Sequence, residues 1–272
     1  MAWAPRPVVR RTVLLAGLGN YTHPTTRHSI GQYVLEPLAR CAAAHDVQVR
    51  AEVAATMERF RGTPHALPPS ELPRAFAMER AAKGWVAKVS VLLDTKPQKG
   101  TKFSPLFKAE PARFPLVLAD IVLYIPKFLM NVSGAGIAAA QGAYPGVRLP
   151  DDVLLLHDEM SRAFGKISFK AGGSAAGHNG VRSAQAMLRT KKVAGDVARI
   201  RIGIGRPPEG VDVSPFVLGT MPSDWLDACQ WPPPGNAPAS AMPELAGAPP
   251  RGELIEQVWK EVVQWCIRPY VP

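Results

Sequence analysis

The chain has 272 residues, 47% of them hydrophobic, and a formal net charge of +10 at pH 7. This length can bury one substantial core, and no apolar run approaches the roughly 18 residues that a membrane span needs. The positive charge favours a polyanionic partner, with nucleic acid first and a membrane surface second, and a generally basic protein is the alternative.

The first predicted elements are a buried strand over 12–18 and a helix over 30–41. Gly19 and Asn20 end the strand with residues that favour turns. His28 lies close to the start of the helix, where a neutral imidazole could accept a proton. An ordinary capping or surface histidine explains that position equally well.

The middle of the chain is less regular. Four prolines between residues 64 and 73 predict no long element over 42–84, and strands follow at 85–93 and 116–124. Between those strands, residues 94–115 are polar and rich in Lys and Pro, which predicts a surface insertion. A helix of small residues is expected over 134–141.

The stretch 153–180 is the most informative. An apolar run over 153–156 predicts a buried strand, and it ends on His157, Asp158 and Glu159. Open α/β sheets place their sites at such strand ends. Residues 166–170 alternate as a half-solvated strand does. A loop of small residues then closes on Gly177, His178, Asn179 and Gly180, and so many small residues allow another chain or a ligand to approach the backbone closely.

The rest of the chain continues the alternation of strand and helix. A helix is expected over 181–188, a strand over 197–205 and a helix over 251–265. The Pro/Ala/Gly tract at about 230–250 predicts a second insertion. The class is therefore α/β, with one domain over 12–268 and two insertions.

The candidate chemical residues each follow an apolar, strand-like run, which predicts one shared pocket. They are Asn20, His28, Asn131, His157, Asp158, His178 and Asn179. A metal site is disfavoured because neither HExxH nor a Cys pair is present, and carboxamides are poor zinc ligands. The nucleophile elbow and the phosphate-loop patterns are missing too. A histidine general base oriented by an aspartate, with carboxamides holding an uncharged polar substrate, is the remaining interpretation.

At this point six motifs, in order, resemble those of bacterial-type peptidyl-tRNA hydrolases. They read GLGN at 17–20, TTRH at 25–28 (Thr25, Arg27 and His28), FLMNVSG at 128–134, HDE at 157–159, GGSAAGHNG at 172–180 and RIGIGRP at 201–207. The resemblance implies a single α/β domain with a mixed, twisted sheet flanked by helices, usually monomeric. It also implies hydrolysis of the ester between a peptide and tRNA, without metal or cofactor.

The resemblance also assigns roles. His28 would be the base that activates water, Asp158 its orienting carboxylate, and Asn20 a group at the scissile ester. Met130, Asn131, His178 and Asn179 would shape the substrate groove, and Lys170 and Arg201 would hold tRNA phosphate. Ser29 and Ser168 depart from the residues that many or some members carry at these positions.

A non-catalytic RNA-binding relative of the same fold is the alternative function. His28 and Asp158 argue against it, since RNA binding alone needs neither. The three cysteines, Cys41, Cys229 and Cys266, are scattered and indicate a reducing compartment. We expect a cytoplasmic protein; the short basic start, Met1 to Thr12, leaves a mitochondrial location as the alternative.

Overall fold

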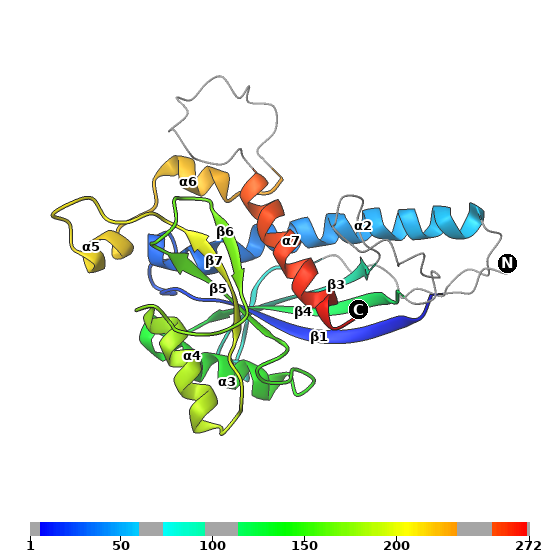
Figure 1. Ribbon diagram of the computed structural model, residues 1–272, viewed down its shortest axis with the longest axis horizontal. Coiled ribbons are helices and arrows are strands. Elements are labelled where there is room, and N and C mark those ends of the chain that lie inside the picture. Colours follow the sequence, from blue (N-terminus) through cyan, green and yellow to red (C-terminus); the bar gives the residue numbers. More distant parts are fainter. Residues whose placement is uncertain (1–5, 60–72, 96–113, 233–251, 271–272) are drawn as a thin grey trace, which may run out of the picture.

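The computed structural model describes residues 6–59, 73–95, 114–232 and 252–270 of the chain. In these ranges seven strands form one sheet in the order β2-β3-β4-β1-β5-β7-β6. The central strands β4, β1, β5 and β7 run parallel, while β2 and β3 at one edge and β6 at the other pair antiparallel. The sheet is mixed and helices flank it on both faces, so the predicted fold class is confirmed (Figure 1).

The strands are β1 (Val8–Gly17), β2 (Ala77–Glu79), β3 (Gly84–Asp94), β4 (Leu116–Pro126), β5 (Val153–Glu159), β6 (Ile167–Lys170) and β7 (Ala198–Gly203). The helices are η1 (Arg27–Ser29), α1 (Ile30–Tyr33), α2 (Leu35–Arg59), η3 (Met130–Val132), α3 (Ser133–Ala143), α4 (Asn179–Thr190), α5 (Val213–Leu218), α6 (Ser223–Ala228), α7 (Glu253–Ile267) and η4 (Arg268–Tyr270).

Alternate residues of the central strands feed two cores. Val13 and Leu15 of β1 pack on the face that α1, α2 and α7 cover. Leu14 and Ala16 pack on the other face, beneath α3 and α4. Because both faces are covered, β1, β4 and β5 read as continuous apolar runs rather than as alternating ones. No helix in the described part of the chain is long and apolar enough to cross a membrane.

Two of the sequence expectations need correction. The helix predicted to end at Cys41 is interrupted near Val34 and then runs to Arg59 as α2, so the absence of a long element over 42–84 was wrong in its first part. The helix-breaking prolines begin only at Pro64, and Pro37 lies in the first turn of α2, where proline is tolerated. The short elements β2 and α6 were missed. The two predicted insertions lie almost wholly outside the described residues.

Glycines let the segment that carries His28 approach the sheet. A Cβ atom on Gly31 would lie 2.1 Å from the carbonyl oxygen of Leu156, in β5. A Cβ atom on Gly19 would lie 2.8 Å from the Cα atom of Ser29. Both approaches are too close for any side chain, so these glycines allow η1 to rest on the ends of β1 and β5. His28 is thereby brought beside the last residues of β5.

Candidate active site

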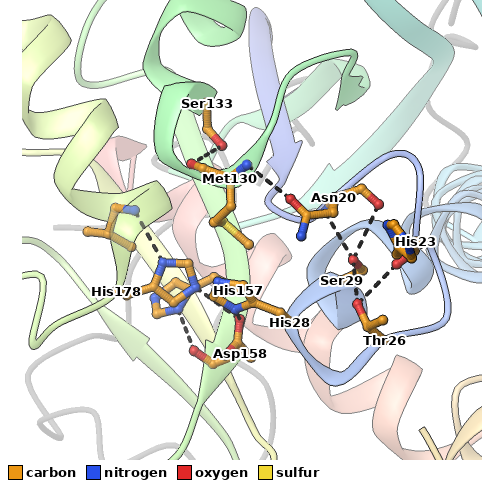
Figure 2. A network of polar contacts seen from close by, with 11 residues as sticks. Asn20, His23, Thr26, His28, Ser29, Met130, Ser133, His157, Asp158 and His178 are labelled. Atoms are coloured by element: carbon orange, nitrogen blue, oxygen red, sulfur yellow. Dashed lines mark hydrogen bonds and ion pairs between the residues drawn. The ribbon is translucent and has the colours of Figure 1, made fainter. Parts of the chain in front are cut away.

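Three side chains from distant parts of the chain meet at the end of β5 (Figure 2). Nδ1 of His28, in η1, lies 2.8 Å from Oδ1 of Asp158, in β5. Nε2 of His178, just before α4, lies 2.9 Å from the same oxygen. The Asp158 side chain is 4% exposed and that of His28 is 13% exposed. The group is thus enclosed, with His28 at the side that solvent reaches.

Asp158 is held in its charged form. Burial by itself would raise the pKa of this carboxyl, but the interactions with His178, followed by those with His28, outweigh it. The pKa of Asp158 therefore lies well below its usual range. A carboxylate only accepts hydrogen bonds, so both facing imidazole nitrogens must carry a proton.

The hydrogen bonds also determine which imidazole nitrogens are free. His178 caps α4, and its Nδ1 accepts the backbone N–H of Val181 at 3.3 Å. Its proton is therefore on Nε2, which donates to Asp158. His28 donates from Nδ1, which leaves the lone pair of its Nε2 available to take a proton from water.

His157 lies behind this group as a neutral ring. Its Nδ1 donates to the carbonyl oxygen of Asp158 at 2.6 Å, and its ring meets the ring of His178 edge-on, with centroids 4.5 Å apart. Burial, and then the neighbouring His178, hold the pKa of His157 well below its usual range. A neutral ring here fills space behind His178 without adding a charge.

Asn20 and Met130 form the other side of the site. Oδ1 of Asn20, just after β1, accepts the backbone N–H of Met130 at 3.1 Å. This bond orients the carboxamide and leaves its Nδ2 group to donate elsewhere. Met130 is 5% exposed, and a Cβ atom on Gly180 would lie 2.5 Å from its sulfur, so the glycine of the small-residue loop makes room for Met130.

Comparisons with known proteins identify the family of this chain. Residues 84–230, more than half of the chain, match the family model for peptidyl-tRNA hydrolase. The chain belongs to the peptidyl-tRNA hydrolase family. The resemblance drawn from the six motifs is thereby confirmed.

Two relatives and one solved structure illustrate this family membership. The chain is 43% identical over 108 residues to a peptidyl-tRNA hydrolase of Mycobacterium marinum, covering 40% of this chain and 53% of that protein. It is 32% identical over 206 residues to a probable peptidyl-tRNA hydrolase of Mus musculus, covering 76% and 72%. A crystal structure of a peptidyl-tRNA hydrolase in complex with n-propanol superposes with a TM-score of 0.53 at 20% identity, over 95% of this chain and 90% of that one. That structure supports the fold alone.

The remaining asparagines stand at the rim of the site. Asn131 is exposed in η3, next to the buried Met130. Asn179 is exposed as the first residue of α4, next to His178. Both side chains are open to solvent, and their substrate-binding roles stay predictions.

The two residues predicted to hold tRNA phosphate lie on the edge strand β6 and on its neighbour β7. Nζ of Lys170 lies 3.3 Å from the carbonyl oxygen of Ser174. Arg201 pairs with Ser168 across the strands and with His157 of β5 on its other side. Its side chain is 19% exposed, and its Nη1 lies 3.4 Å from Glu159. Lys170 is thus the more available of the two, and both roles stay predictions.

His28, Asp158 and His178 are also the one set of described side chains close enough to hold a metal ion, with ligand atoms within 4.8 Å of one another. The positions of the imidazole protons argue against a metal ion at this site. A metal on Nε2 of His178 would move that proton to Nδ1, where the N–H of Val181 already donates. Two donors would then face each other, so the chemistry of this donor set does not fit a resident metal.

Three residues at or beside the site were not among the predicted site residues. Ser29 entered the sequence argument only as a departure, yet it is fully buried beneath Asn20. Arg199 is 2% exposed and donates to the carbonyl oxygens of Gly173 and Ser174, so it supports the small-residue loop. Its spacing of two from Arg201 was the available signal, because such residues share a strand face. Glu159 is the partner of Arg201.

Proposed function

We propose that this protein hydrolyses the ester bond between the peptide and the tRNA in peptidyl-tRNA, with His28 as general base. Membership of the family implies the reaction. The single observation that carries the mechanism is the 2.8 Å hydrogen bond between His28 and Asp158, residues 130 positions apart in sequence. An ionised carboxylate that binds Nδ1–H leaves Nε2 as a base and stabilises the imidazolium once it forms.

The proposed chemistry needs one water and one histidine. Nε2 of His28 takes a proton from water as the water oxygen attacks the ester carbonyl carbon. The tetrahedral intermediate then collapses, the bond from that carbon to the ribose 3′ oxygen breaks, and the proton on Nε2 passes to the departing oxygen. The products are a free tRNA hydroxyl and a peptide acid, so His28 ends in its starting form.

The substrate roles rest on position. Asn20 lies across the site from His28, with Nδ2 free to donate to the ester. Asn131 and Asn179 would pair with the peptide backbone, because a carboxamide offers both a donor and an acceptor. Lys170 and Arg201 would hold phosphate on the β6–β7 side, beyond His157 and Glu159.

The test is turnover of peptidyl-tRNA by the variant His28→Ala. We expect a fall of about 10²–10⁴-fold in kcat, because the general base is lost. Affinity for tRNA, measured by filter binding, should change little because His28 makes no phosphate contact in this scheme. His23→Ala is the matched control, since His23 is an exposed histidine of the same loop that contacts only Thr22 with its ring.

Two results would reject the mechanism. Wild-type turnover in His28→Ala would show that His28 is not the general base. Tight tRNA binding without any turnover in the unaltered protein would favour the non-catalytic RNA-binding alternative. A mass measurement of the protein in solution is the separate test of the expectation that it is a monomer.

A further inference from the structure

The loop between β1 and η1 contains a chain of hydroxyl groups beneath Asn20 (Figure 2). Oγ of Ser29 accepts the backbone N–H of Asn20 at 3.0 Å. It also lies 3.0 Å from Oγ1 of Thr26, which in turn bonds the carbonyl oxygen of His23 at 3.0 Å. Ser29 is fully buried and Thr26 is 5% exposed. These hydroxyls therefore exchange bonds with one another rather than with water.

The available donors and acceptors determine which group donates in each of these hydrogen bonds. The carbonyl oxygen of His23 can only accept, so the Thr26 hydroxyl donates to it. The Ser29 hydroxyl is then the donor to Thr26, and its lone pair accepts from Asn20. Its other contact, with the carbonyl oxygen of Asn20, is at 3.5 Å and too long to compete. Each hydroxyl thus makes one donated and one accepted bond.

The hydrogen bonds of Thr26 and Ser29 connect two parts of the active site. Asn20 is held from above by the N–H of Met130 and from below by Ser29. Ser29 is also the residue after His28 and the last residue of η1. A shift of Ser29 would therefore change the separation between the carboxamide that faces the ester and the imidazole that activates water.

We propose that Ser29 is a positioning residue that acts on the reaction through Asn20, with Thr26 holding its hydroxyl in place. The inference rests on the proposed function, in which Asn20 binds the substrate ester. Without the Ser29 hydroxyl, the part-buried N–H of Asn20 loses its acceptor and the Asn20 backbone turns to find another. The Asn20 carboxamide then leaves the position at which its Oδ1 meets Met130.

The test is a double-mutant cycle on kcat/KM for N-acetyl-aminoacyl-tRNA, with Ser29→Ala made in the unaltered protein and in Asn20→Ala. We expect a loss of about tenfold in the unaltered protein. In the Asn20→Ala background the loss should fall below about twofold, because the carboxamide that Ser29 places is already gone. A purely structural role would give equal losses in both backgrounds, and that result would overturn the proposal.

Two further variants keep the test decisive. Valine has nearly the shape of threonine, so Thr26→Val removes the acceptor of the Ser29 hydroxyl with little change in packing. It should lower kcat/KM by less than Ser29→Ala does, and again only when Asn20 is present. This variant serves as the test if Ser29→Ala does not fold. Ser90→Ala is the matched control, because Ser90 loses a bond to Asp120 in the sheet, away from the site. Its kcat/KM should stay unchanged.

A binding cycle separates this proposal from the reaction itself. The probe is a peptidyl-adenosine whose ester is replaced by an amide, so that it binds without being cleaved. Ser29→Ala should weaken its affinity in the unaltered protein and leave it unchanged in Asn20→Ala. This measurement stands even if the protein fails to hydrolyse peptidyl-tRNA, which would reject the proposed function alone. Equal weakening in both backgrounds would reject the role of Ser29.

Discussion

The end of β5 and the face of β6 and β7 differ in how completely their hydrogen bonds are made. Around Asp158 the facing nitrogens of His28 and His178 each have an assigned partner, and Nε2 of His157, beside them, is the buried atom without one among the described residues of that group. On the neighbouring strands, buried atoms of Ser168, Arg199 and Arg201 have no partner among the described residues. Two of those three are arginine donors. In the first region the facing side chains are already paired, whereas the second keeps buried arginine donors without a partner among the described residues.

The largest effect is expected from breaking the completed region. Asp158→Asn keeps an oxygen that can accept from both histidines at the position of Oδ1, but it removes the negative charge that stabilises the His28 imidazolium when it forms. By analogy with the orienting aspartate of serine proteases, we expect kcat for peptidyl-tRNA to fall by up to about 10⁴-fold. Affinity for tRNA should be kept. A fall of less than tenfold in kcat would show that the carboxylate does not orient the base.

Asp158 also predicts how this region responds to acid. Its pKa is lower in the folded protein than in the unfolded chain, so its contribution to stability is complete above the unfolded value and is lost as the pH falls through the folded value. Asp158→Asn should therefore weaken the dependence of stability on pH on the acid side. The free energy of unfolding of both proteins from pH 7 to pH 3, measured with urea, checks this, and parallel curves would contradict it.

The next effect concerns which substrate enters the site. Peptidyl-tRNA should be hydrolysed far faster than aminoacyl-tRNA with a free amine. The free amine would carry its charge into a site whose carboxylate, Asp158, is already bound by two histidines, and desolvating that charge is unfavourable. The measurement is kcat/KM for the same aminoacyl-tRNA with and without an N-acetyl group. Comparable values would withdraw the roles of Asn20, Asn131 and Asn179.

The positive charges of Lys170 and Arg201, on β6 and β7, predict a salt effect. Lys170→Ala and Arg201→Ala should each weaken tRNA binding and lower the slope of log affinity against log salt by about one charge. Lys260→Ala removes the same charge from α7, on the other face of the sheet, and should leave the slope unchanged. Unaltered slopes in both test variants would show that this face does not contact phosphate.

A smaller effect is expected where the base-bearing loop meets the segment after β7. The guanidinium of Arg27 lies over the ring of Phe216 at 4.7 Å, and its Nη1 donates to the Phe216 carbonyl oxygen at 3.2 Å. Arg27→Lys keeps the charge but loses the flat contact, so kcat should fall by about three- to tenfold. Arg206→Lys, at an exposed arginine, is the control. An equal change in both variants would contradict a specific role for Arg27.

From the residues alone, the sequence predicted one shared pocket, because the candidate side chains follow apolar runs and the ends of parallel strands meet at one edge of a sheet. The pairing of His28 with Asp158 was implied by the resemblance to the family. The length of α2 was missed because the prolines after residue 63 were weighed over the whole of 42–84, although residues 42–59 contain neither Gly nor Pro. The end of a helix depends on how far along the chain a helix-breaking residue acts.

The finer geometry of the site was beyond the sequence. That His178 caps α4 while donating to Asp158 depends on the approach of α4 to β5, which tertiary packing decides. The burial of Ser29 beneath Asn20 depends on a loop that folds back on itself. Arg201 was expected to be free for phosphate, but its partner Glu159 comes from a different strand. Each of these contacts joins segments whose spacing in sequence carries no periodic signal.

Removal of metal should have the smallest effect on turnover. An unchanged turnover would sharpen the contrast between the end of β5 and the face of β6 and β7. His28, Asp158 and His178 offer three ligand atoms, yet a metal would require new tautomers of both histidines. On His28, a metal at Nδ1 would move the proton to Nε2 and remove the base. On His178 it would set a second donor against the N–H of Val181. We therefore expect turnover after EDTA treatment to match the untreated protein, provided that magnesium is restored to keep tRNA folded. Activity that returned with zinc but not with magnesium would mean that the hydrogen-bonded arrangement around Asp158 is not the active one.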